Sequence, residues 1–269
     1  MLLAIDIGNT NIVFGVYQNK TWLNHWRIQT DQLKTADEYE VIFRSLLTAG
    51  KICRTETTGI ILSSVVPSLV HPFLEMLRSL FPKAQISTVS PEIYSTLPIK
   101  ILNPYQIGTD LVANAVAAFQ KYSNNTMVID FGTALTFTTI GNDSEILGVA
   151  IAPGLQTAVS ALAGKTAQLP QIHLTPPPSI LGENTIHAIQ AGVVYGFTGL
   201  VDSIIERTQK EMNKNLTVVA TGGLASVIAP LTKNVKTIEP MLTLDGLVGI
   251  NSYISNSPQS TLEAHPILE

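Results

Sequence analysis

An apolar run that ends in Asp-x-Gly occurs twice in this chain, and this repeat constrains the fold more than any other feature. Residues 2–10 read LLAIDIGNT, and residues 127–134 read MVIDFGTA. Each copy is typical of a buried strand that leads into an acidic, glycine-containing turn. Asp6 and Asp130 are separated by nearly half of the 269 residues. The spacing therefore predicts a duplicated domain with two facing acidic turns that hold a polyphosphate and its metal between them.

The elements after each turn are predicted in the same order. In the first half, the pattern indicates strands over residues 11–17, 21–28 and 59–66, and helices that run from the capping box of Thr35 and Glu38 to Gly50 and over residues 68–80. In the second half, it indicates strands over residues 126–130, 135–140, 145–150 and 216–220, and a long helix from Asn184 or Thr185 to near Asn213. An Ala-rich helix over residues 113–122 lies between the halves. The predicted domains are residues 1–115 and 116–255, followed by a polar tail over residues 256–269.

Charge and composition exclude several classes of function. A net charge of −4 without a Lys/Arg run argues against a nucleic-acid partner, because such a surface needs many phosphate contacts. Cys53 is the only cysteine, which excludes an internal disulfide and fits a reducing cytosol. Residues 1–5 are apolar and are followed directly by Asp6, which favours a strand over a signal peptide. No run reaches the roughly 18 apolar residues that a membrane span requires. We expect a soluble, cytoplasmic protein without a membrane partner.

The two glycine turns are the first candidate binding sites. In the first of them, glycine lets the backbone approach phosphate oxygens, while the Asp6 carboxylate faces the accompanying cation directly or through water. The alternative is an ordinary hairpin turn that uses the same residue types. Because the pattern occurs twice, each time between two strands, it favours the phosphate-binding interpretation.

Asp110 allows two interpretations. It follows Gly108 and Thr109 and directly precedes the Ala-rich helix, so the sequence alone favours a helix N-cap, worth about 1 kcal/mol. The other interpretation is a general base, because a carboxylate within hydrogen-bonding reach can take a proton from a substrate hydroxyl.

Three further motifs have structural alternatives. Gly222-Gly223 fits either close contact with an adenine or ribose, or a strand-to-helix turn with positive φ. Gly164-Lys165-Thr166 looks like the end of a P-loop, but the first glycine of that pattern falls on Val159, which rejects it. The five histidines lack the paired spacing of a zinc site.

Taken in order, the motifs resemble those of the type III pantothenate kinases, within the acetate kinase, sugar kinase, Hsp70 and actin superfamily. Residues 6–10 with Gly15 resemble the first phosphate motif of this family, residues 103–110 its substrate motif, and residues 130–134 its second phosphate motif. Further matches are Pro153-Gly154, Asn184-Thr185 with residues 188–192, residues 222–225 and residues 245–247. The resemblance extends from Asp6 to about Gly249.

The resemblance implies an α/β fold of two duplicated ribonuclease H-like (actin-like ATPase) domains, each a mixed five-stranded sheet with helices. It also implies transfer of the γ-phosphoryl group of ATP, bound with Mg²⁺, to the primary hydroxyl of pantothenate, the first step towards coenzyme A. Members of the family are dimeric, with the substrate site near the subunit interface, so the resemblance implies a homodimer.

The resemblance also implies roles for individual residues. Asp110 would be the general base, Asp130 would help to bind a monovalent cation, K⁺ or NH₄⁺, and Thr133 would contact the ATP phosphates. The remaining ATP contacts would be Asp6, Ile7, Gly8, Asn9, Thr10, Asn11, Ile12 and Val13. The pantothenate contacts would be Gly108, Thr109, Asp110, Leu111 and Thr185.

The chain departs from the family pattern at three positions. Leu111 stands where many members carry Arg, Thr138 follows Phe137 in a segment where many carry Asp, and Ile101 stands where an aromatic residue is frequent. Loss of the Arg removes a charge-assisted hydrogen-bond donor. Two alternatives therefore stay open: a kinase for another small hydroxyl compound on the same fold, and a non-catalytic regulatory relative. Asp110 and both phosphate turns weigh against the second.

Overall fold

The structure is a computed structural model that describes residues 1–256, and its chain divides into two compact units. Unit 1 comprises Met1–Ala117 and the described residues from Thr243 onward, and unit 2 comprises Ala118–Leu242. Residues 257–269, nearly all of the predicted polar tail, lie outside the described residues.

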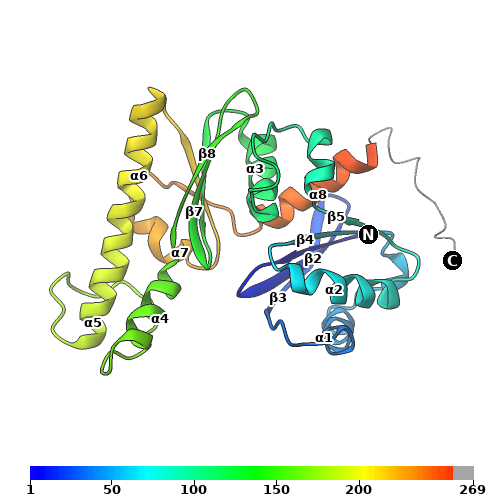
Figure 1. The fold of residues 1–269 in the computed structure, drawn as a ribbon, viewed down its shortest axis with the longest axis horizontal. Coiled ribbons are helices and arrows are strands. Elements are labelled where there is room, and N and C mark those ends of the chain that lie inside the picture. Colours follow the sequence, from blue (N-terminus) through cyan, green and yellow to red (C-terminus); the bar gives the residue numbers. More distant parts are fainter. Residues whose placement is uncertain (257–269) are drawn as a thin grey trace. The chain divides into compact units, whose positions relative to one another are not determined.

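Unit 1 contains a mixed five-stranded sheet in the order β3-β2-β1-β4-β5 (Figure 1). Its strands are β1 (Leu2–Ile7), β2 (Asn11–Gln18), β3 (Thr21–Gln29), β4 (Gly59–Ser64) and β5 (Gln85–Thr88). Its helical elements are α1 (Ala36–Ala49), η1 (Arg54–Glu56), α2 (Pro67–Leu80), η2 (Pro91–Thr96), the start of α3 (Thr109–Tyr122), and α8 (Leu242–Asn256). The central strand β1 pairs antiparallel with β2 and parallel with β4.

Aromatic rings join the helices of unit 1 to its sheet. The Phe14 ring of β2 stacks on Phe43 of α1 with 4.1 Å between centroids, and Tyr39 of α1 contacts Phe73 of α2. The predicted capping box forms, because Thr35 accepts from the Glu38 backbone and the Glu38 side chain accepts from Thr35. This start orients α1 so that its buried face meets α2, which lies beside it (Figure 1).

Unit 2 repeats the strand topology in the order β10-β9-β6-β7-β8. Its strands are β6 (Thr126–Phe131), β7 (Ala134–Ile140), β8 (Ile146–Pro153), β9 (Thr217–Thr221) and β10 (Thr237–Ile238). Its helical elements are α4 (Leu155–Lys165), α5 (Thr185–Gln190), η3 (Ala191–Tyr195), α6 (Gly196–Met212), α7 (Ala225–Ile228) and η4 (Ala229–Leu231). The strand β6 pairs antiparallel with β7 and parallel with β9, as β1 does with β2 and β4, so the predicted duplication of the fold is confirmed.

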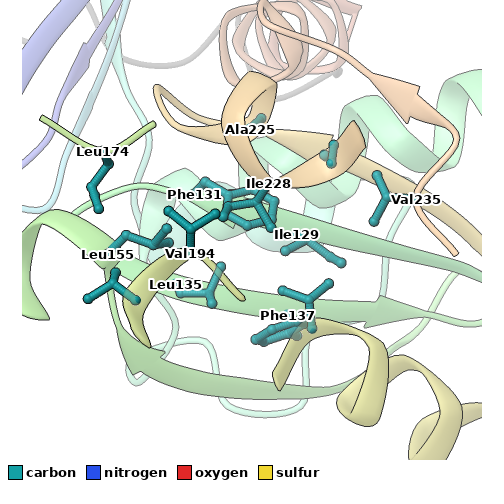
Figure 2. Packing of buried hydrophobic residues seen from close by; sticks show 14 of the residues in the cluster. Ile129, Phe131, Leu135, Phe137, Leu155, Leu174, Val194, Ala225, Ile228 and Val235 are labelled. Atoms are coloured by element: carbon teal, nitrogen blue, oxygen red, sulfur yellow. The ribbon is translucent and has the colours of Figure 1, made fainter. Parts of the chain in front are cut away.

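The core of unit 2 lies between this sheet and its helices. Figure 2 shows Ile129 and Phe131 of β6 beside Ile228 of α7, and Leu135 of β7 near Leu155 of α4. Burial of these side chains fixes the end of β6, the strand that carries Asp130.

The long helix predicted in unit 2 begins and ends as expected. Asn184 accepts a hydrogen bond from the His187 backbone at 2.9 Å, and Asn213 closes the helix in the left-handed conformation with φ 50°. Between these caps, α5 and α6 are joined by the single π-helical turn η3. The expectation of one regular helix is therefore refined by this π turn.

Residues Thr185–Met212 are long and apolar enough, by length and composition alone, to cross a membrane. The stretch includes His187, Gln190 and Thr198, so it is not an unbroken apolar run and does not contradict the expectation that no such run occurs. Val194, Val201 and Ile205 of this stretch belong to the core of unit 2. The same composition is typical of a core helix in a soluble protein.

Two boundaries differ from those predicted. Residues 243–255 were expected in the second domain, but α8 belongs to unit 1, where Thr243 donates to Asn114 of α3 at 2.8 Å. A Cβ on Gly246 would lie 1.9 Å from the Ala113 carbonyl oxygen, so glycine permits this close approach of α8 and α3. The helix expected over residues 113–122 begins earlier, at Thr109.

Candidate active site

The first glycine turn joins β1 to β2 and is fixed by backbone hydrogen bonds. Gly8 N–H donates to the Asn11 carbonyl at 3.0 Å, and Thr30 Oγ1–H donates to the Gly8 carbonyl at 2.6 Å. Ile7 and Ile12 are fully buried and anchor the turn from both sides, whereas the tip residues Asn9, Thr10 and Asn11 are exposed. The turn therefore exposes its polar tip and buries its two isoleucine side chains.

Asp6 is connected to the start of α3 through Ser63. Ser63 Oγ–H donates to Asp6 Oδ1 at 2.9 Å, and Thr109 Oγ1 lies 2.9 Å from Ser63 Oγ. The Thr109 hydroxyl also donates to the Ser64 carbonyl at 3.3 Å, so Thr109 contacts two neighbouring residues at the end of β4. Register explains the contact, because Ser63 of β4 lies directly beside Asp6 of β1. Sequence reasoning missed Ser63; its signal was a pair of serines at the end of an apolar strand.

Asp110 lies in the first turn of α3 and is not its N-cap. The Gly108 carbonyl accepts from Val112 N–H at 3.2 Å, which places Gly108 at the N-cap position and Asp110 two residues later. The Asp110 carboxylate accepts from Leu111 N–H at 2.9 Å. Because a Cβ on Gly108 would lie 2.3 Å from Asp110 Oδ1, glycine leaves the space that this carboxylate occupies. The capping interpretation is corrected accordingly.

Burial sets the electrostatics of Asp110. Desolvation raises the pKa of its carboxyl above the usual Asp range, and the N–H groups of Leu111 and Asp110 oppose this shift. The space that a Cβ on Gly108 would fill is bordered by the Asp110 carboxylate and, at 3.6 Å, by the apolar Val65 Cγ1. Among residues 1–256, Asp110 forms no ion pair. A raised pKa makes the ionised carboxylate a stronger base than an ordinary Asp side chain.

The second glycine turn joins β6 to β7, and two glycines from other segments pack against it. A Cβ on Gly222 would lie 2.4 Å from Asp130 Oδ1, and a Cβ on Gly154 would lie 2.3 Å from the Gly132 carbonyl oxygen. The Thr133 carbonyl accepts from Gly154 N–H at 3.0 Å and from Thr157 Oγ1–H at 2.7 Å. Gly154 therefore has a supporting role that its sequence context did not indicate.

Gly222 has φ +90°, which confirms the expected turn with positive φ. Its closest neighbours are Asp130 and the Phe131 backbone, so within unit 2 this glycine makes room for an acidic side chain.

A second polar group accompanies Asp130. Thr136 of β7 is its cross-strand partner, so both side chains lie on the same face of the sheet. The Thr136 hydroxyl is buried and has no hydrogen-bond partner in the described part of the chain. Residues 1–256 contain no group of three or more His, Cys, Asp or Glu residues placed to hold a metal ion.

Thr185 lies in unit 2 as the first residue of α5, away from the acceptor segment of unit 1 in the chain. It borders a hollow of about 690 Å³ whose lining includes Leu162, Leu169 and Phe197. The structure thus brings Asp6, Thr109 and Asp110 together in unit 1, and assigns Asp130, Thr133 and Thr185 to unit 2.

Comparison with known proteins identifies the family. A profile described as type III pantothenate kinase matches residues 2–207. The chain belongs to this family. A type III pantothenate kinase from Citrifermentans bemidjiense is 42% identical over 247 residues, which cover 92% of this chain and 97% of that relative. The relative from Moorella thermoacetica is 43% identical over the same shares of both chains.

Solved structures with low identity share the fold. A proposed Baf-family transcriptional activator from Campylobacter jejuni superimposes with a TM-score of 0.58 at 18% identity, over 95% of this chain and 100% of that one. The activator of 2-hydroxyisocaproyl-CoA dehydratase from Clostridium difficile, solved with ADPNP, gives 0.53 at 13% identity, over 98% and 99%. The predicted fold class and the predicted enzyme class, a pantothenate kinase, are confirmed.

Proposed function

We propose that the chain performs the reaction of type III pantothenate kinases with Asp110 as the general base. The reaction is ATP-dependent phosphorylation of pantothenate, the first step of coenzyme A biosynthesis. The observation that carries the residue assignment is the largely desolvated Asp110 carboxylate, which has no cationic partner among residues 1–256. Asp110 also follows Thr109 directly, and Ser63 connects Thr109 to Asp6.

In this mechanism Asp110 accepts the proton of the primary hydroxyl as its oxygen attacks the γ-phosphorus. The proton moves to Asp110, the new P–O bond forms at pantothenate, and the bond to the bridging oxygen of ADP breaks. Such a transfer depends mainly on alignment and on neutralised charge, so no covalent enzyme intermediate is needed. Gly108, Thr109 and Leu111, at the start of α3 beside the base, are proposed to contact pantothenate.

The ATP phosphates are proposed to contact residues 6–13 of unit 1 and Thr133 of unit 2. The exposed tip of the first turn supports this assignment, since Gly8 keeps its backbone free of a side chain there. Asp6 would hold Mg²⁺, directly or through water, and Ser63 orients its carboxylate. Mg²⁺ would neutralise charge on the phosphates.

Asp130 is proposed as a ligand of a monovalent cation, K⁺ or NH₄⁺. The unpartnered, buried hydroxyl of Thr136 on the same face fits this group, because cations of this type bind oxygen ligands. The bound cation would supply positive charge near the phosphates.

Asp130→Asn is expected to raise the K⁺ concentration for half-maximal activity by about tenfold, the effect of losing about 1.4 kcal/mol of binding. The amide keeps an oxygen but loses the negative charge. Titration of KCl at fixed ionic strength measures this value. An unchanged K⁺ dependence, with the variant folded and active, would contradict the assignment.

A coupled assay of ADP formation tests the proposed substrate. With ATP and Mg²⁺, we expect pantothenate to raise ADP release by more than about tenfold over water alone, since the correct acceptor completes the site. Other hydroxyl compounds, such as glycerol and simple sugars, serve as matched acceptors. The observation that favours a different acceptor is Leu111, which is buried and stands where many members of the family carry Arg. A higher kcat/KM for another hydroxyl compound than for pantothenate would establish a kinase for that compound.

We also propose that the protein is cytoplasmic, that it forms a homodimer, and that Thr185 contacts pantothenate. The homodimer is supported by the edge strand β8, which exposes Leu147, Val149 and Ile151, because exposed apolar clusters are typical of interaction surfaces.

A further inference from the structure

The start of α8 contacts α3 one helical turn after Asp110. Thr243 Oγ1–H donates to Asn114 Oδ1 at 2.8 Å, and Asn114 is fully buried. A Cβ on Gly246 would lie 1.9 Å from the Ala113 carbonyl oxygen, so the two backbones approach closely here. Because Asn114 follows Asp110 by four positions, both side chains lie on the same face of α3. The helix that carries the proposed base is therefore fixed by α8 close to that base.

The start of α8 is in turn fixed to the sheet of unit 1. Trp22 Nε1–H of β3 donates to Asp245 Oδ1 at 2.8 Å, which joins residues 223 positions apart. The indole ring lies over Gly15 of β2, since a Cβ there would lie 2.8 Å from two of its ring carbons. The Tyr17 ring contacts the indole edge-on, with 5.0 Å between the centroids. Trp22 is thus confined by β2 and holds Asp245 at a defined place.

The first turn of α3 needs such external support. Its N-cap is Gly108, which has no side chain that could accept from the free N–H groups of the helix start. Tertiary contacts hold this start from two sides. Thr109 contacts Ser63 and the Ser64 carbonyl of β4, and the turn that follows Asp110 contacts α8. The place of the Asp110 carboxylate is therefore set by β4 and α8 together.

We propose that Thr243, Asp245 and Gly246 are positioning residues for Asp110 in the kinase reaction. Thr243 and Gly246 fix the second turn of α3, and Asp245 fixes α8 to Trp22. The Asp110 carboxylate is thereby held where it accepts the proton of the acceptor hydroxyl. The inference rests on the proposed function, in which Asp110 is the general base. Displacement of a catalytic group by about 1 Å lowers a rate about 100-fold, so a contact that sets the place of α3 is measurable in kcat.

Gly246→Ala tests the contact with the largest expected effect. The new Cβ would lie 1.9 Å from the Ala113 carbonyl oxygen, and an ordinary contact needs 3.4 Å, so the two helices must separate by about 1.5 Å, the difference between these distances. We expect kcat for pantothenate phosphorylation to fall about 100-fold, while KM for ATP stays within about twofold. Initial rates of ADP formation give both values, and circular dichroism shows whether the variant is folded.

Thr243→Val removes the hydrogen bond to Asn114 and keeps the size of the side chain. We expect kcat to fall about three- to tenfold, and Thr243→Ser, which retains the hydroxyl, to keep the wild-type value within about twofold. Trp22→Phe removes the donor to Asp245 but keeps an aromatic ring, and it is expected to lower kcat about threefold. These milder variants test the proposal even where Gly246→Ala does not fold.

A double-mutant cycle with Asp110→Asn provides the readout that a purely structural role would not move. Residues that act through one group lose their effect on the rate when that group is removed. In the Asp110→Asn background, we therefore expect Thr243→Val and Gly246→Ala to lower the residual kcat by less than about twofold.

Gly50→Ala is the matched control for destabilisation of unit 1. Gly50 follows α1 with φ −76°, so alanine is not strained there, but its Cβ would lie 2.6 Å from the Trp26 ring. The nearest neighbours of this Cβ are Trp26 and Asn24 of β3, and not residues of α3 or α8. We expect a lower urea midpoint of unfolding with kcat within about twofold of the wild type.

Wild-type kcat in Gly246→Ala and Thr243→Val would overturn positioning by α8, as would effects that multiply with that of Asp110→Asn. A loss of kcat in Gly50→Ala equal to that in Gly246→Ala would attribute the effect to general destabilisation. Wild-type kcat in Trp22→Phe would overturn the anchoring of α8 to the sheet. A fully active Asp110→Asn refutes the general base itself, whereas an inactive Asp110→Asn with wild-type kcat in the α8 variants refutes the positioning alone.

Discussion

Asp110→Asn lowers kcat for pantothenate phosphorylation by about 10²–10⁴-fold, the range typical of a lost general base. The amide has nearly the shape of the carboxylate but cannot accept the proton of the primary hydroxyl. Because the loss arises in the chemical step, KM for ATP is expected to change little. Initial rates of ADP formation at saturating pantothenate measure the effect.

The pH profile provides the specific signature of this base. Burial raises the pKa of the Asp110 carboxyl, so in the wild type kcat/KM for pantothenate falls as the pH drops through that raised value. The acidic limb therefore lies above the ordinary Asp pKa of about 3.9. We expect the Asp110→Asn profile to lack this limb, and a variant that retains wild-type kcat and the limb would refute the assignment.

Stability measurements separate catalysis from folding in this variant. A raised carboxyl pKa means that the folded state holds the proton more tightly than the unfolded chain does. The protonated Asp110 carboxyl therefore contributes fully to the free energy of unfolding at a pH below the Asp pKa of the unfolded chain. This contribution is lost as the pH rises through the pKa of Asp110 in the folded protein. The amide of the variant cannot ionise, so at neutral pH Asp110→Asn is expected to unfold at an equal or higher urea concentration than the wild type.

Local sequence signals predicted most of the elements that carry the site. Capping residues marked the starts of α1 and α5, and Asp-x-Gly motifs marked the ends of β1 and β6. The edge strands β5 and β10 were missed because they are short and depend on parallel neighbours that are distant in sequence. The unit membership of α8 was missed for the same reason, since Gly246 meets Ala113 only through tertiary packing.

The supporting residues of the site could not be predicted from spacing. Ser63 reaches Asp6 through the register of β4 with β1, and Trp22 reaches Asp245 across 223 positions of the chain. The motif residues themselves, Asp6, Asp110 and Asp130, were found because short patterns mark them. Sequence thus identifies groups that carry chemistry, while folding determines which neighbours orient them.

Gly222→Ala is expected to destabilise the protein by about 2–4 kcal/mol and to weaken activation by K⁺. About 1 kcal/mol or more follows from placing alanine at φ +90°. A further roughly 1–3 kcal/mol follows from overpacking, since the new Cβ would lie 2.4 Å from Asp130 Oδ1 and 2.6 Å from the Phe131 nitrogen. Urea unfolding measures the first effect and KCl titration the second.

Gly199→Ala is the matched control, because the same substitution is expected to change the free energy of unfolding in the opposite direction. Gly199 lies within α6, is exposed, and has no atom within 4 Å of an added Cβ. Alanine there is expected to stabilise the helix by up to about 1 kcal/mol without affecting K⁺ activation. If Gly222→Ala matched this control in both measurements, Gly222 would not hold Asp130 in place. A large destabilisation with unchanged K⁺ dependence in the folded variant would instead restrict Gly222 to its role in the turn, and would contradict the expectation that Gly222 holds Asp130 in place for cation binding.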